Sequence, residues 1–353
     1  SQSGVGAYEA ALVTDNDGFA VAWYDTRDGN AEIYLRLLDA MGHPSGPARR
    51  LTETPEASYE ASLERLGDTF ILAWYEQTMD GRQTAMLGAW NRDGSRKWSH
   101  AIAPGSRNPV IRTNGHAIAA AWIQAEPDGS ENVWVGTWGG DGQEQRTRAR
   151  VGAVSKTTWN LNLAQDGSDI WVVFDAATST RANELFLGRV DATSVRLERL
   201  TRDDGATSKY PDLAIDDQGR AALTWYDMRD GNDEVYLLVG RTADLHGEID
   251  TRARRITTTE GESIGAYVAW NAGHVGLAWS DKEPGAHEIY FESFDSSGMP
   301  LGSVRRLTRT DKWSLVPAIR PWRTGFALAW TEYQPASSQI HDGAGEIAFT
   351  LVE

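Results

Sequence analysis

The hydrophobic positions along this chain follow a short alternating pattern that returns seven times. Each copy contains an apolar segment that ends on a large aromatic residue: Trp23, Trp74, Trp122, Phe174, Trp225, Trp279 and Trp330. Successive aromatics are separated by 51, 48, 52, 51, 54 and 51 residues, so seven copies account for the whole chain. A period in this range is typical of architectures in which each repeat packs on its neighbours.

Within each copy the pattern predicts four short strands. In the first copy an apolar run at 10–13 and a second run ending on Trp23 are followed by a polar turn at 25–30. An alternating run at 32–35 and a short segment that ends on Arg50-Leu51-Thr52 complete the copy. Short runs between Gly, Asn and Asp turns, without a helical period, indicate antiparallel strands.

A four-stranded sheet cannot bury both of its faces alone, but sheets stacked radially can. The repeat therefore predicts an all-β, seven-bladed β-propeller that forms a single domain (1–353), with the repeated aromatic as a wedge between blades. The expected blades are approximately 7–54, 55–103, 104–153, 154–203, 204–259, 260–310 and 311–353.

Closure of the ring is expected to be incomplete. The Arg-Leu/Ile-Thr segment recurs at 199–201, 255–257 and 306–308, and its copy for blade 7 would fall just before residue 1. We therefore expect that the native chain is longer or that blade 7 lacks its outer strand. An open sheet edge invites pairing with another chain.

Composition narrows the classes of function. Lys and Arg number 34 against 50 Asp and Glu, a net charge of −16 that argues against nucleic acid as a partner. The 41% apolar residues and 15 Trp exclude intrinsic disorder, and the absence of Cys excludes disulfides, thiolate catalysis and Cys-based zinc sites. The longest apolar run, 117–123, is far shorter than the roughly 20 residues of a membrane helix, so we expect no membrane insertion.

Two blocks carry a family resemblance. The sequences YDTRDGNAEIY at 24–34 and YDMRDGNDEVY at 226–236, each followed by an RLT or RIT segment, resemble the TolB-type propeller repeat. The resemblance is full in blades 1 and 5, and blade 6 keeps Glu288-Ile289-Tyr290. It implies a propeller and a secreted or periplasmic location, but it implies no partner or activity. The Asp-box typical of sialidases is absent.

A ligand site is expected where the innermost strands begin, around the mouth of the central channel. Counting back fourteen or fifteen residues from the aromatics finds rings, carboxylates and amides in the first blades, and apolar or small residues in blades 6 and 7. Rings and polar groups of this kind suit sugars, whose C–H faces stack and whose hydroxyls need hydrogen bonds. Alternatively, the side chains plug the channel and satisfy one another. The expected ligand-binding residues are Tyr8, Glu9, Tyr59, Glu60, Arg107, Asn108, Trp159, Asn160 and Tyr210.

Three classes of function remain open, and the third of them is an assembly module that uses the open edge of blade 7. The favoured one is an extracytoplasmic binding or scaffold module that recognises a glycan or a protein at the channel mouth. The alternative is a carbohydrate-active enzyme, either a glycosidase with two carboxylates or a polysaccharide lyase with a Tyr or His base and an Arg that neutralises a carboxylate. The candidates for a catalytic role are Glu9, Glu60, Tyr59, Tyr210, Arg107 and His287.

Other polar groups have a second, structural explanation. Oxygen side chains at every second position form a weak calcium candidate, but tight hairpin turns use the same residue types. An acidic rim is expected two residues after the aromatics, for example at Asp25 and Asp227, although Asp at a turn also caps backbone N–H groups. No His spacing is typical of zinc, and we expect no cofactor besides calcium. His341 lies in the longest hairpin loop. The calcium candidates are Asp28, Asn30, Glu32, Asp230, Asn232 and Glu234.

Overall fold

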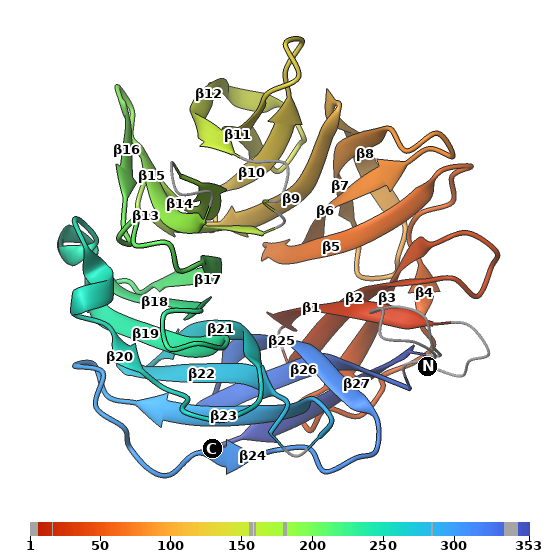
Figure 1. Cartoon of the computed structure of the whole chain (residues 1–353). Coiled ribbons are helices and arrows are strands. Elements are labelled where there is room, and N and C mark those ends of the chain that lie inside the picture. The colour runs from red at the N-terminus through yellow and green to blue at the C-terminus, as the bar shows by residue number, and fades with distance from the viewer. Residues whose placement is uncertain are drawn as a thin grey trace.

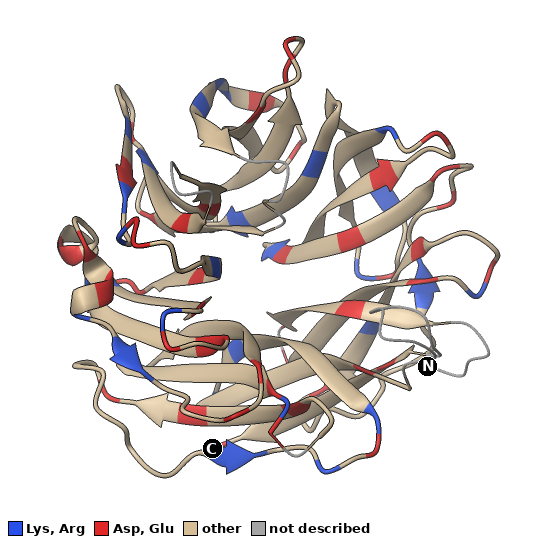
Figure 2. Cartoon of the chain, in the orientation of Figure 1, with Lys and Arg blue, Asp and Glu red and all other residues tan. Residues whose placement is uncertain are grey.

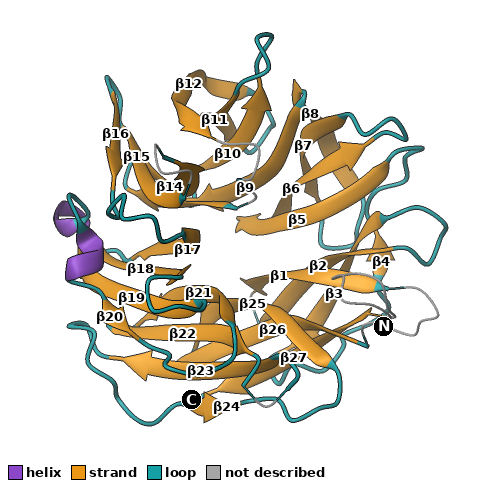
Figure 3. Ribbon diagram, viewed as in Figure 1, coloured by secondary structure: helices purple, strands orange, loops and turns teal. Residues whose placement is uncertain are grey.

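The computed structural model arranges the chain as a ring of seven antiparallel sheets around a central channel (Figure 1). Strands dominate, and two single-turn 3-10 helices, η1 (Thr242–Asp244) and η2 (Ile249–Thr251), lie at the periphery of blade 5 (Figure 3). The structure describes residues 6–15, 17–154, 158, 160–178, 182–283, 285–334 and 345–353.

The first four blades are complete. Blade 1 comprises β1 (Ala7–Asp15), β2 (Gly18–Asp25), β3 (Glu32–Asp39) and β4 (Arg49–Arg50). Blade 2 comprises β5 (Ala57–Leu66), β6 (Thr69–Gln77), β7 (Gln83–Trp90) and β8 (Arg96–Pro104). Blade 3 comprises β9 (Ser106–Thr113), β10 (Ala117–Ala125), β11 (Glu131–Gly139) and β12 (Glu144–Val154). Blade 4 comprises β13 (Leu161–Asp166), β14 (Asp169–Ala177), β15 (Asn183–Val190) and β16 (Val195–Arg199).

The last blade has one strand fewer than the others. Blade 5 comprises β17 (Ser208–Ile215), β18 (Arg220–Asp227), β19 (Glu234–Arg241) and β20 (Arg254–Arg255). Blade 6 comprises β21 (Ser263–Asn271), β22 (His274–Asp281), β23 (Glu288–Phe294) and β24 (Arg305–Arg306). Blade 7 comprises β25 (Trp313–Trp322), β26 (Gly325–Tyr333) and β27 (Gly345–Val352). The predicted seven-bladed propeller, with blade 7 lacking its outer strand, is confirmed.

The repeated aromatic residues form the core between blades. Each lies on the second strand of its blade and packs against the preceding blade; Trp225, for example, is fully buried among the apolar residues of blade 4. Trp225 also stacks on Tyr236 of the neighbouring strand, with ring centroids 5.7 Å apart. The aromatic therefore holds two blades together, as the repeat predicts.

Asp25 and Asp227 cap turns and bond the aromatic wedge, as the structural explanation of these positions predicts, rather than forming an exposed acidic rim. Asp227 accepts a hydrogen bond from the indole N–H of Trp225 at 3.1 Å, and Asp25 accepts one from Trp23 at 3.2 Å. Asp25 also accepts the backbone N–H of Arg27 at 2.9 Å, and both aspartates are about 1% exposed. These carboxylates satisfy the polar edge of the aromatic wedge and cap the turn that follows it.

A β-bulge interrupts the innermost strand of six blades, opposite the aromatic residue. Two residues of the inner strand face the single aromatic; in blade 1, pairing jumps from Tyr8 with Tyr24 to Ala11 with Ala22. The first residue of each bulge has a positive φ, and bulges of this kind turn a side chain away from its regular direction. We call these six the bulge residues: Glu9 (φ 57°), Glu60 (51°), Asn108 (48°), Tyr210 (51°), Gly265 (59°) and Val316 (55°).

Candidate functional site

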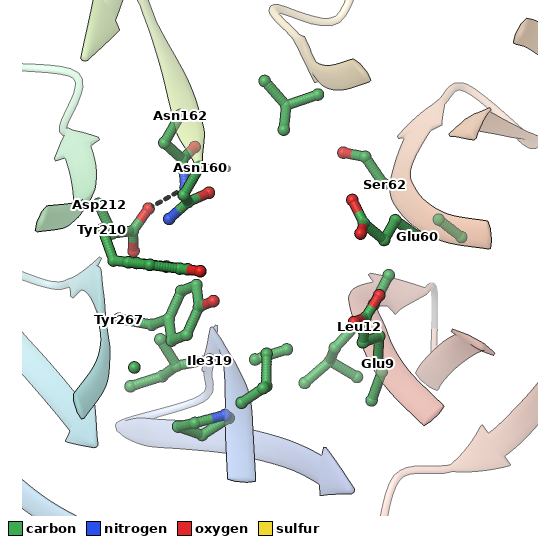
Figure 4. Close-up of a pocket in the computed structure, with 18 of the residues that line it drawn as sticks. Glu9, Leu12, Glu60, Ser62, Asn160, Asn162, Tyr210, Asp212, Tyr267 and Ile319 are labelled. Carbon is green, nitrogen blue, oxygen red and sulfur yellow. Dashed lines mark hydrogen bonds between the residues drawn. The ribbon is translucent and has the colours of Figure 1, made fainter. Parts of the chain in front are cut away.

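A cavity of about 600 Å³ occupies one end of the channel. The inner strands of all seven blades contribute to its lining, and the six bulge residues all belong to it. Figure 4 shows Glu9 and Glu60 on one side of this cavity, and tyrosine rings and amides together with Asp212 on the other. The bulges thus convert seven similar strands into a ring of chemically different side chains around one space.

One wall carries a pair of carboxyl groups. Glu9 and Glu60 lie on neighbouring blades and project into the cavity from the same side (Figure 4). The Asn108 amide donates to Glu60 Oε2 at 2.6 Å, and the Tyr75 hydroxyl also hydrogen bonds this carboxylate. The backbone N–H of Glu9 donates to Thr331 Oγ1 of blade 7 at 2.9 Å. The backbone of one carboxyl residue and the side chain of the other are therefore held by neighbouring groups.

The two carboxyl groups interact electrostatically. Burial, and then the charge of Glu60, raise the pKa of Glu9 well above its ordinary value. Burial raises the pKa of Glu60 to about 7, although the charge of Arg107 and the Tyr75 hydrogen bond act in the opposite direction. A coupled pair in a site of low polarity releases its protons in two separate steps. Both carboxyl groups therefore hold their protons to a higher pH than an exposed glutamate, and the charge of Glu60 opposes ionisation of Glu9.

A ladder of tyrosine rings lies behind these carboxyl groups. Tyr8 packs against Tyr24, Tyr24 against Tyr59 and Tyr59 against Tyr75, with successive ring centroids 5.3, 5.2 and 5.6 Å apart. Burial raises the pKa of Tyr24, and the nearby charges of Glu9 and Glu60 raise it further. The packed rings therefore back the side of the cavity that carries the carboxyl pair.

The opposite wall is aromatic and amide-bearing. Tyr210 and Tyr267 present their rings to the cavity beside Asn160 (Figure 4). Tyr210 stacks on Tyr226 with centroids 5.3 Å apart, and burial raises the pKa of Tyr210 to about 12. Blades 6 and 7 close the cavity with apolar side chains: Ile264, Leu315, Val316, Pro317 and Ile319.

The cavity brings together five of the residues that the sequence suggested. These are Glu9, Glu60, Asn108, Asn160 and Tyr210. The lining does not include Tyr8 or Tyr59, which belong to the ladder behind the carboxyl groups. Trp159 and His341 lie outside the described residues.

Arg107 and His287 are also placed away from the cavity. Arg107 is buried, pairs with Glu131 at 2.9 Å and donates to the carbonyl oxygen of Thr158 at 2.7 Å. His287 is buried against the Trp313 ring, with centroids 5.1 Å apart, and burial lowers its pKa to about 4. Neither side chain is part of the cavity lining.

The register explains which residues reach the cavity. Neighbouring residues on a strand point to opposite faces, so in blades 1 and 2 the residues before the bulges, Tyr8 and Tyr59, pack behind the cavity lining instead. In blade 5 the hairpin is one residue longer, and Lys209 pairs with Tyr226 as Tyr8 pairs with Tyr24. Tyr210 is therefore the counterpart of Glu9, a position that fixed spacing had assigned to Pro211.

A second group of polar residues lies deeper in the channel. We call it the charged girdle: Glu64, Arg112, Asn162, Asp212 and Arg320. Glu64 pairs with Arg320 at 3.4 Å and with Arg112 at 3.6 Å. Arg112 donates to Asn162 at 2.9 Å, Asn162 donates to Asp212, and Asp212 accepts the backbone N–H of Val268 at 2.8 Å.

The charged girdle lies between the first cavity and a second one, of about 820 Å³, toward the other end of the channel. Arg112, Ile319 and Arg320 line both cavities. Figure 2 shows residues of both charge signs on the strands that surround the channel. The spacing used above does not reach this group, but a different spacing would have: Glu64, Arg112 and Arg320 each lie ten residues before the aromatic residue of their blade.

The calcium candidates are engaged within their hairpins. Asp28 accepts a hydrogen bond from the Tyr34 hydroxyl, the Asn30 amide donates to two backbone carbonyls, and Glu32 pairs with Arg50 at 2.8 Å. Among the described residues no group of three or more His, Asp or Glu side chains is arranged to hold a metal ion. The corresponding contacts in blade 5 are made by Asp230, Asn232 and Glu234.

Comparison with known proteins identifies the fold. Neither protein-family models nor curated proteins match the sequence. Similar solved structures include polysaccharide lyase Uly1 (TM-score 0.60, 7% identity, covering 98% of this chain and 90% of that one). The β-propeller domain of the Trilobed protease from Pyrococcus furiosus, with an open velcro topology, gives a TM-score of 0.58 at 8% identity over 98% and 95% of the chains.

A third similar structure is the α-L-arabinanase of Penicillium chrysogenum, with a TM-score of 0.53 at 11% identity over 83% of this chain and 94% of that one. At such identities the likeness shows the β-propeller fold alone. In the part of the chain that the structure describes, no helix has the length and apolar character needed to cross a membrane.

Proposed function

We propose that this propeller binds a saccharide in the cavity lined by the bulge residues and hydrolyses a glycosidic bond there. The observation that carries the proposal is the Glu9–Glu60 pair, two carboxyl groups of raised pKa that project from neighbouring blades into one cavity of about 600 Å³. Carboxyl groups with raised, coupled pKa values in a cleft are candidates for acid–base chemistry. Most glycosidases combine one protonated and one ionised carboxyl group.

The environment assigns different roles to the two groups. Glu60 is stabilised as a carboxylate by Asn108, Tyr75 and the charge of Arg107, so it acts as the base or nucleophile. Glu9 retains its proton longer and donates it to the leaving oxygen. Tyr210 and Tyr267 on the opposite wall supply ring faces for the sugar, and Asn160 supplies donors and acceptors for its hydroxyls.

Hydrolysis is better supported than elimination. A lyase needs a base and a group that neutralises a uronate carboxylate, but Arg107 is already paired with Glu131. Tyr59 and His287 lie outside the cavity lining, and the pKa of Tyr210, about 12, makes it a weak base precursor. The similar structures include both an arabinanase and a polysaccharide lyase, which supports a carbohydrate ligand for either chemistry.

The second candidate function is a binding module without turnover. It is favoured by the bonds that Glu60 already makes with Asn108 and Tyr75, which allow the carboxylate to act as a fixed acceptor for sugar hydroxyls. For both functions we propose an extracytoplasmic location, secreted or periplasmic. The TolB-type resemblance of blades 1 and 5 supports this location. A polysaccharide ligand supports it as well, because polysaccharides are mostly found outside the cytoplasm.

The test uses purified protein on neutral and acidic polysaccharides, with binding, new reducing ends and the ultraviolet absorbance of new double bonds measured together. We expect reducing ends, and we expect Glu9→Gln and Glu60→Gln to lower kcat at least about 100-fold while binding persists. The exposed Glu53→Gln is the matched control and leaves kcat unchanged. Binding without turnover assigns the binding module instead, new double bonds assign a lyase, and no binding to any glycan overturns the saccharide proposal.

A further inference from the structure

Four blades fasten the segment beside their third strand in the same way. In blade 1, the Glu32 carboxylate accepts hydrogen bonds from Arg50 at 2.8 Å and from the Thr52 hydroxyl. Thr52 Oγ1 accepts the backbone N–H of Ile33 at 2.8 Å, and the N–H of Leu51 donates to the Ile33 carbonyl at 2.7 Å. We call this arrangement the outer-strand clasp. One buried carboxylate binds both the Arg and the Thr of an Arg-Leu-Thr segment.

The outer-strand clasp recurs with nearly the same geometry. Its glutamate, arginine and threonine are Glu234, Arg255 and Thr257 in blade 5, and Glu288, Arg306 and Thr308 in blade 6; blade 4 keeps Glu184 and Thr201. In all four blades the glutamate is at most about 1% exposed. Because the three complete copies share Arg-Arg-(Leu or Ile)-Thr, the clasp selects a sequence as well as an extended backbone.

Blade 7 carries the glutamate of the clasp without its partner segment. Glu346 lies opposite Glu332 on the neighbouring strand, as Glu32 lies opposite Asp25 in blade 1. Glu346 is therefore the blade 7 counterpart of Glu32. Within the described residues, β26 is the only strand that pairs with β27. The Glu346 side chain is 45% exposed and has Lys312 at 3.6 Å. Half of the outer-strand clasp is therefore present and open to solvent.

The apolar positions next to Glu346 are uncovered in the same way. Ile33 and Leu35 of blade 1 are at most about 1% exposed, whereas their counterparts Ile347 and Phe349 are only partly buried. An added strand would cover these side chains as well as bond the backbone. Strand addition of this kind draws affinity from main-chain hydrogen bonds and specificity from side-chain pockets.

We propose that the edge of β27 binds an extended segment of sequence Arg-Arg-(Leu or Ile)-Thr, presented by a partner polypeptide. The second arginine pairs with Glu346, and the threonine hydroxyl bridges the Glu346 carboxylate and the N–H of Ile347. The Leu or Ile N–H donates to the carbonyl of Ile347, as Leu51 does to Ile33. This site lies at the rim of the ring and is independent of the saccharide cavity.

The test measures binding of a fluorescent peptide copied from residues 48–55, Ala-Arg-Arg-Leu-Thr-Glu-Thr-Pro, by anisotropy. We expect saturable binding that weakens at least tenfold when the peptide carries Arg50→Glu with Thr52→Val, or when the protein carries Glu346→Lys. The matched control Asp68→Lys, at a site 93% exposed on blade 2, leaves the affinity unchanged. Hydrogen exchange of the β27 amides should slow when the peptide is bound.

A fusion keeps the test decisive if the free peptide binds weakly. In this fusion, Arg-Arg-Leu-Thr follows Glu353 through a nine-residue Gly-Ser linker. The linker has the length of the connection at 40–48 in blade 1. Tethering raises the local concentration of the segment to roughly the millimolar range. We expect a higher Tm for this fusion, and none of the gain with Glu346→Lys. Absence of both binding and Tm gain overturns the proposal, as does a concentration-dependent dimer through β27 that the peptide fails to dissociate.

Discussion

At the scale of single residues, the bulge residues combine backbone strain with control of direction. A left-handed conformation costs an L-residue roughly 1–2 kcal/mol, and Val316, branched at Cβ, adopts it at φ 55°. The same conformation turns Glu9 and Glu60 into the cavity while Tyr8 and Tyr59 pack behind them. Strain at the five non-glycine bulge residues around one cavity is typical of a functional site.

Replacing the one glycine among the bulge residues measures this strain. A Cβ added at Gly265 would lie 4.0 Å from its nearest neighbour, Tyr267, so Gly265→Ala changes the backbone energy without a clash. We expect it to lower the free energy of unfolding by about 1 kcal/mol in urea denaturation. Gly302→Ala, where φ is not positive and no atom lies within 4 Å, is the control and should be neutral. Equal stability of the two variants would contradict the strained geometry.

The carboxyl pair predicts how stability depends on pH. The folded-state pKa of Glu60, about 7, is above its ordinary value of 4.5, so the folded protein binds more protons between these limits. The free energy of unfolding therefore decreases as pH rises from about 4.5 to about 7. Glu60→Gln removes this contribution, whereas that of Asp175, whose pKa burial also raises to about 7, remains. Parallel stability curves for the two proteins would show that Glu60 does not titrate in this range.

At the scale of strands and blades, the aromatic wedge carries much of the stability. Trp225 is fully buried, stacks on Tyr236 and bonds Asp227, so Trp225→Ala opens a cavity and removes the indole donor. We expect a loss of about 3–5 kcal/mol in urea unfolding followed by circular dichroism. Trp98→Ala, on the partly exposed outer strand β8, should cost less. A small loss at Trp225 would mean that neighbouring blades repack around the gap.

The architecture could be predicted because the strands repeat with a period that the aromatics mark. Five lining residues could be predicted for the same reason, since spacing from the aromatic locates the mouth of the channel. The bulges could not be predicted, because they depend on how the strands pair. In blade 5 the hairpin before Trp225 is one residue longer, which moves Tyr210 into the position that Glu9 has in blade 1. The contacts of the charged girdle could not be predicted, because Glu64 and Arg320 become partners only when the ring brings distant strands together.

At the scale of the whole molecule, the net charge of −16 limits which saccharides bind well. The acidic surface repels a polyanion. Salt weakens this repulsion, because the Debye length is only about 8 Å at 0.15 M and exposed charges farther apart than this are largely screened. We expect binding of an acidic polysaccharide to strengthen as NaCl rises from about 0.02 to 0.2 M, whereas binding of a neutral one stays constant. Titration calorimetry at the two salt concentrations measures this, and weakening with salt would indicate local basic contacts instead.

The charged girdle also affects which molecules can pass along the central channel. Its bonds link side chains of five blades, from Glu64 and Arg320 through Arg112 and Asn162 to Asp212, so a polymer that passed from one cavity to the other would have to pass these paired groups. We therefore expect a long saccharide, bound as we propose, to enter and leave the first cavity at the end away from the charged girdle.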